Sequence, residues 1–143
     1  MDRQNWTLVT IAAGKTPLQP VQLQKALFLI SKNVAPKILG KKFYTFEPYD
    51  YGPFCKAIYD DASLLETNKL AEITQPLGSR FNVYSATPSG LDAAAAIRQA
   101  LPKEVTEYVD RMVAFVQSVT FTQLVSAIYK TYPEMREKSV FRG

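Results

Sequence analysis

Residues 43–66 read FYTFEPYDYGPFCKAIYDDASLLE, and this stretch is the one that we expect to decide the fold. Its first half is crowded with aromatic side chains, and Pro48 prevents a continuous helix through it. Gly52 allows the backbone to turn, and Pro53 is expected at the first position of a new helix, where its missing N–H costs nothing. Apolar side chains then recur at the spacing of one helix face: Phe54, Ile58, Ala62 and Leu65. The prediction is an aromatic lead-in followed by a helix with an inward-facing apolar stripe.

The length and composition indicate an ordinary globular protein. A chain of 143 residues can bury a core and is expected to form one domain over residues 1–143. No apolar run approaches the roughly 18 residues that span a bilayer, and the start MDRQNWTLV lacks the pattern of a secretion signal. The lone Cys55 cannot form an intrachain disulfide, which is typical of a reducing compartment. We therefore expect a cytoplasmic protein with no membrane partner.

The residues used most often in catalysis are scarce. With 0 histidines and 1 cysteine, the chain cannot assemble a Cys/His zinc site or a histidine-dependent triad, and no GxGxxG or GxxxxGK[ST] motif is present to hold phosphates. Asp60 and Asp61 are adjacent on the expected helix and point about 100° apart, so they cannot converge on one ion. Glu47 and Asp50 could converge, but no third ligand is evident. We expect no enzyme activity, no cofactor and no metal ion.

The rest of the chain predicts further helices and one hairpin. Strands are expected over 70–74 and 81–86, with the hairpin tip at Pro76, Gly78 and Ser79. Two helices, a helix opened by Gly-Pro and a hairpin follow the order of a winged helix-turn-helix. The expected fold class is mainly α (α+β), a winged-helix-like core with a two-stranded hairpin followed by three packed helices. Helices outside the central segment are expected over 2–13, 20–33, 88–101, 102–119 and 120–132.

The helical spacing also predicts which side chains face inward. Leu91 in the helix after the hairpin and Phe121 in the last helix are expected to face the core. Lys25 and Lys32 lie seven residues apart in the second helix and are expected to share its solvated side.

Four segments together resemble a known family. LQKALFLI (23–30), FYTFEPYDYGPF (43–54), VYSATPSG (83–90) and YPEM (132–135) resemble the Panacea (SocA-like antitoxin) domain family, with the closest likeness to its small stand-alone, YwgA-like bacterial members. The resemblance covers roughly residues 18–90 and departs from the usual pattern at Ala86-Thr87. It implies a helical domain with a winged-helix-like centre. It also implies a role in toxin–antitoxin or phage-related modules, where the domain neutralises a partner or presents it to a protease.

The aromatic turn is the expected contact surface. Exposed tyrosines rimmed by Lys or Arg are typical of protein interface hot spots. The same pattern is typical of platforms for single-stranded nucleic acid, but the acidic face of the following helix favours protein. In a different interpretation, Phe46 and Tyr51 are core or turn residues that fill the gap between helices. The expected partner-binding residues are Tyr49, Asp50, Tyr51, Phe54, Lys56, Tyr59, Asp60 and Glu134.

DNA binding by a winged-helix transcriptional regulator is the alternative function. The net charge of +4 permits it. However, a recognition helix over 53–66 would expose more acidic than basic side chains, whereas a helix in the major groove needs Arg, Lys, Asn or Gln toward the bases. In this alternative the chain forms a homodimer through the 102–119 helix. The candidate nucleic-acid residues are Lys37, Lys41, Lys42, Lys56 and Arg80.

Overall fold

The computed structural model describes residues 1–141, which fold mainly into helices with two short antiparallel hairpins, an α+β architecture as predicted. None of the helices described is both long and apolar enough to cross a lipid bilayer. The elements are α1 (Arg3–Ala12), α2 (Pro20–Asn33), α3 (Pro36–Leu39), β1 (Glu47–Tyr49), β2 (Gly52–Phe54), α4 (Ala57–Thr67), β3 (Ala71–Thr74), β4 (Val83–Ala86), α5 (Pro88–Gln99), α6 (Lys103–Ser118), α7 (Phe121–Thr131) and the 3₁₀ turn η1 (Pro133–Arg136).

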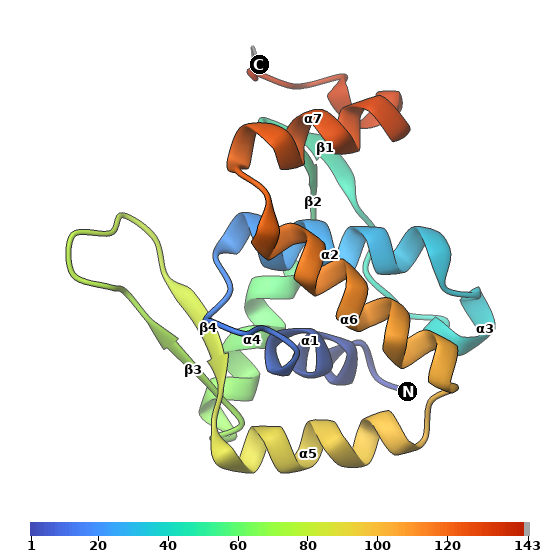
Figure 1. The fold of residues 1–143 in the computed structure, drawn as a ribbon, viewed down its shortest axis with the longest axis vertical. Helices are drawn as coiled ribbons and strands as arrows, with labels where there is room; N and C mark the ends of the chain where they lie inside the picture. Colours follow the sequence, from blue (N-terminus) through green and yellow to red (C-terminus); the bar gives the residue numbers. More distant parts are fainter. Residues whose placement is uncertain (142–143) are drawn as a thin grey trace.

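Helices α1 and α2 form the centre of the molecule. Figure 1 shows α1 between α5 on one side and α2 with α6 on the other, and α1 also packs on α4. Trp6 on α1 is fully buried, and its indole Nε1 donates a hydrogen bond to the Leu39 carbonyl at 3.1 Å. The expected α4 stripe is confirmed for Ile58, Ala62 and Leu65, which are all buried.

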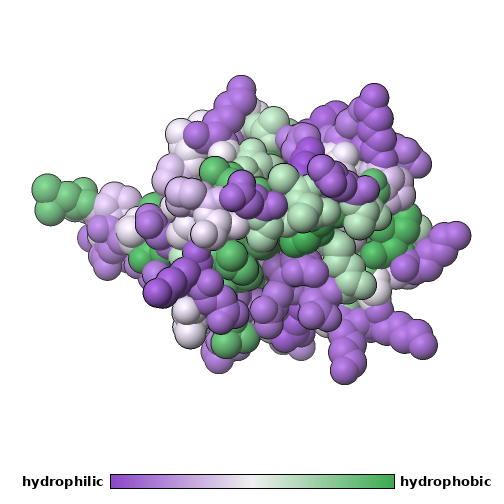
Figure 2. Space-filling model, turned by 90° about the horizontal axis from the view of Figure 1, so that it is seen from below, coloured by the Kyte–Doolittle hydropathy of each residue, from purple (hydrophilic) through white to green (hydrophobic). Residues whose placement is uncertain are grey.

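Helix α5 packs through small residues. Gly90 and Ala94 are its buried positions, and a Cβ on Gly90 would collide with the Leu70 carbonyl. The prediction that Leu91 faces the core is therefore wrong, because this close approach turns Leu91 outward, where it is 51% exposed. Seen from the α5 side, apolar residues form a band among hydrophilic ones (Figure 2).

The two hairpins differ from the sequence prediction. The predicted hairpin exists, but β4 starts at Val83, and Phe81 lies exposed in the connecting loop. The second hairpin, β1–β2, was not predicted. Pro53 does not open a helix but pairs with Pro48 across this hairpin, and α4 starts later, at Ala57. Proline is tolerated there because a two-stranded ribbon consists only of edge strands.

The order expected for a winged helix is present, with β1–β2 inserted between α3 and α4. That the core is a winged helix stays a prediction.

A buried polar cluster joins α1, α4 and the segment before β1. Asp61 is 4% exposed and accepts hydrogen bonds from Arg3 Nε at 2.9 Å and from the Tyr44 hydroxyl at 2.6 Å. The Tyr44 hydroxyl also lies 2.6 Å from Thr7 Oγ1. Burial, with the hydrogen bond to Asp61, raises the pKa of Tyr44 above its usual value. Every charged group in this cluster has a partner.

Candidate functional site

The residues predicted to bind a partner centre on the β1–β2 pair, which we call the tyrosine hairpin (Glu47–Phe54). Tyr49 pairs with Gly52, so Asp50 and Tyr51 form the connecting loop. Gly52 has a φ of 105°, a conformation that residues with side chains rarely adopt. The role expected for Gly52, to let the chain turn, is thus confirmed.

Two side chains of α2 form hydrogen bonds with the backbone at the end of the hairpin. Lys25 Nζ donates to the Pro53 carbonyl at 3.2 Å. Gln24 makes a reciprocal pair of bonds with Cys55, donating from Nε2 to its carbonyl at 2.8 Å and accepting from its N–H at 2.9 Å. The backbone after the loop is therefore tied to the central helix.

The last described residues hold the hairpin from the other side. The Asp50 carbonyl accepts hydrogen bonds from Val140 N–H at 2.9 Å and from Ser139 Oγ at 3.2 Å. Phe141 is buried and packs edge-on against Tyr129 of α7. The loop is thus fixed at both ends, and its conformation is preorganised.

The tyrosines of this fixed hairpin are exposed. Tyr49 is 52% exposed and stacks on Phe54 with ring centroids 4.9 Å apart. Tyr51 is 45% exposed and meets the edge of Phe121 at 5.2 Å. The inward position expected for Phe121 is therefore wrong, and of the two structural positions considered for Tyr51, core or turn, the structure has the turn. Phe46 is half-buried against the core, in line with its structural interpretation.

A pocket of about 260 Å³ opens between the hairpin, α2 and the start of α7. It brings together five of the eight predicted partner-binding residues: Tyr49, Asp50, Tyr51, Phe54 and Tyr59. Burial raises the pKa of Tyr59 to about 12. The remaining lining residues are Pro20, Val21, Gln24, Lys25, Gly52 and Phe121.

The other three predicted residues lie outside the pocket. Lys56 and Asp60 form an exposed ion pair at 3.8 Å, one turn apart. Glu134 is exposed on η1, which contacts β1. These residues can only form the rim of a contact surface.

Lys25 is the charged residue among the lining residues that the sequence interpretation missed. It is 4% exposed, not solvated, because the hairpin covers this side of α2. Burial lowers the pKa of Lys25 to about 8. A signal was available in the sequence: Phe28 and Leu29 extend the apolar stripe of α2 beyond one face. A helix with so wide an apolar surface is covered from several directions.

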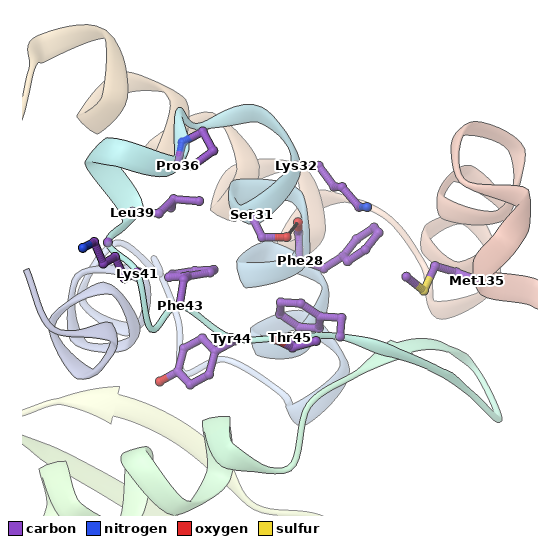
Figure 3. Close-up of a pocket in the computed structure, with 12 residues that line it drawn as sticks. Phe28, Ser31, Lys32, Pro36, Leu39, Lys41, Phe43, Tyr44, Thr45 and Met135 are labelled. Carbon is purple, nitrogen blue, oxygen red and sulfur yellow. Dashed lines mark hydrogen bonds between the residues drawn. The ribbon is translucent and has the colours of Figure 1, made fainter.

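The candidate nucleic-acid residues are exposed but scattered. Lys37 on α3 and the β3–β4 loop, which carries Arg80, lie on opposite sides of the molecule (Figure 1). Lys41 and Lys32 lie at opposite ends of a pocket of about 350 Å³ lined by Phe28, Phe43 and Met135 (Figure 3). Lys42 lines a neighbouring pocket with Lys41, and Lys56 is paired with Asp60.

Within residues 1–141, no three His, Cys, Asp or Glu side chains lie close enough together to hold a metal ion. Comparison with known proteins found no matching family model, no matching curated protein and no matching solved structure. The resemblance to the Panacea family therefore stays a prediction based on the segments quoted above.

Proposed function

We propose that this protein is a non-enzymatic regulatory interaction module, antitoxin-like or related to phage defence, that binds a partner protein in the cytoplasm through the tyrosine hairpin. The observation that supports it best is the combination of two exposed tyrosines with a backbone fixed from both sides. Tyrosine supplies a large contact area for little conformational entropy. A preorganised loop loses little further freedom on binding, so more of the contact energy remains as affinity.

The test is capture of partners from the native host by the tagged protein, with the product of a neighbouring toxin-like gene as the first candidate. Tyr49→Ala and Tyr51→Ala should each weaken binding of a captured and then purified partner at least about tenfold, the range of hot-spot residues. Phe81→Ala is the matched control, because Phe81 is an exposed aromatic residue (45%) outside the tyrosine hairpin.

Both tyrosine variants should remain folded, since these rings are half exposed and lose only a surface stacking contact of about 1 kcal/mol. A partner that binds all three variants as well as it binds the native protein would contradict the proposal. So would a loss of binding that is equal in Phe81→Ala.

DNA binding has weaker support, because the basic residues do not form one surface. For a homodimer through α6, Tyr108, Phe115 and Val119 are only partly available, because they pack against the chain's own core. A band-shift assay with random duplex at low salt tests this alternative. A shift at micromolar protein that is lost on Lys37→Ala and Lys41→Ala would favour DNA binding over the proposal.

A further inference from the structure

Lys25 is a buried cation that has no counter-charge among the described residues. Within residues 1–141, the ion pairs belong to Arg3, Lys56, Arg98 and Lys103, and no carboxylate oxygen lies within 4.0 Å of Lys25 Nζ. An ammonium group has three N–H donors, and the Pro53 carbonyl is the one hydrogen-bond acceptor found for them in the described residues. Proteins rarely bury an unpaired ammonium, because the loss of hydration is costly.

A second polar group near Gly52 also lacks a partner. The Tyr129 hydroxyl is buried and has no hydrogen-bond partner among the described residues. The Tyr129 ring and the end of the Lys25 side chain both lie next to Gly52. A Cβ on Gly52 would lie 3.4 Å from Tyr129 Cε1 and 3.6 Å from Lys25 Cε. The Lys25 ammonium and the Tyr129 hydroxyl thus place unused hydrogen-bond donors close to Gly52 of the tyrosine hairpin.

The pocket beside this point is open to a ligand and is lined by Lys25. Its other charged or titratable lining residues are Asp50, Tyr49, Tyr51 and Tyr59. Lys25 is the one Lys or Arg among the lining residues and is buried, whereas Asp50 is exposed. Apolar and aromatic walls around a single buried cation suit a carboxylate on a short aliphatic stem.

We propose that the partner protein inserts an aspartate or glutamate side chain into this pocket, where its carboxylate pairs with the Lys25 ammonium. This proposal rests on the proposed function and names the chemistry that the tyrosine hairpin recognises. The pairing supplies acceptors for the unused N–H donors, and the low local dielectric strengthens it. The tyrosines would supply contact area, and Lys25 would supply selectivity for an acidic side chain over a neutral one.

The test needs no identified partner. The probes are N-acetyl-glutamate N-methylamide and its neutral isostere, N-acetyl-glutamine N-methylamide, titrated into ¹⁵N-labelled protein and followed by NMR. The glutamate probe should shift the amide signals of Gly52 and Cys55 and the Lys25 Nζ signal. It should bind at least about tenfold more tightly than the glutamine probe, as expected for a hydrogen bond between charged groups. N-acetyl-alanine carries only a C-terminal carboxylate. It tests whether the pocket binds the carboxylate at the end of a chain, and it should bind more weakly than the glutamate probe.

Lys25→Met removes the charge and retains an apolar stem, and its fold is checked by the melting temperature. It should bind the glutamate and glutamine probes equally. The proposal is overturned if the native protein binds both probes equally, if neither binds at tens of millimolar, or if N-acetyl-alanine binds best. Any of these results can occur while Tyr49→Ala still loses the partner, so failure here is distinct from failure of the proposed function.

Discussion

Two buried polar clusters of this molecule differ in how completely they are paired. Around Asp61, the carboxylate has the Arg3 guanidinium and the Tyr44 hydroxyl as partners, and that hydroxyl also meets Thr7. Around Gly52, Lys25 has one carbonyl partner, and Tyr129 has none in the described chain. A complete cluster contributes to the fold, whereas an incomplete one costs stability and leaves hydrogen-bonding capacity for another molecule.

The largest effect should come from breaking the complete cluster. Asp61→Ala leaves Arg3 and the Tyr44 hydroxyl without their acceptor and should lower the free energy of unfolding by about 3 kcal/mol. Asp60→Ala, next to it on α4, removes only an exposed ion pair and should cost about 0.5 kcal/mol or less. Urea denaturation of both variants measures this difference. Equal losses would show that the Asp61 cluster does not stabilise the fold.

The incomplete cluster should appear in the pH dependence of stability. The pKa of Lys25 is lowered from 10.5 to about 8 in the fold. Between these values the unfolded chain binds a proton at Lys25 that the folded chain does not, so the Lys25 contribution to stability rises with pH, by about 2 kcal/mol from pH 8 to pH 10.

As the pH approaches 10, four tyrosines oppose this rise, because burial raises the pKa of Tyr44, Tyr59, Tyr84 and Tyr108 in the folded protein and the unfolded chain releases their protons first. Denaturant unfolding across this range provides the measurement, and Lys25→Met should lack the rise between pH 8 and pH 10. A rise of the same size in that variant would assign the effect to other groups.

The smallest expected effect compares two buried phenols. Tyr44→Phe leaves Thr7 and Asp61 without a shared partner and should cost about 1.5 kcal/mol. Tyr129→Phe removes a hydroxyl without a partner in the described chain and should cost nothing or give a small gain. Melting temperatures of the two variants measure the contrast. A destabilised Tyr129→Phe would mean that the Tyr129 hydroxyl makes a stabilising hydrogen bond in the folded protein.

The sequence predicts what depends on local spacing and fails where distant segments meet. Ile58, Ala62 and Leu65 were placed correctly because helical periodicity is a local property. Pro53 was misplaced because proline suits both a helix start and an edge strand, and only its pairing with Pro48 decides between them.

The exposure of the candidate site was harder to predict. The sequence leaves core, turn and contact surface open for Tyr51, because nothing in its neighbourhood shows that it packs on Phe121, 70 positions further along the chain. Lys25 resembles a solvated helix residue until the hairpin is seen to cover it. A buried lysine could have been suspected only from the width of the apolar surface of α2.

The bond between Ser139 and the Asp50 carbonyl spans 89 positions of the chain. During translation the loop of the tyrosine hairpin leaves the ribosome long before the residues that fix it from that side. A chain that stops between Arg136 and Ser139 would contain every described helix but lack this support for the loop. In our proposal, recognition of a partner would then depend on synthesis at least as far as Ser139 and Val140, which bond the Asp50 carbonyl.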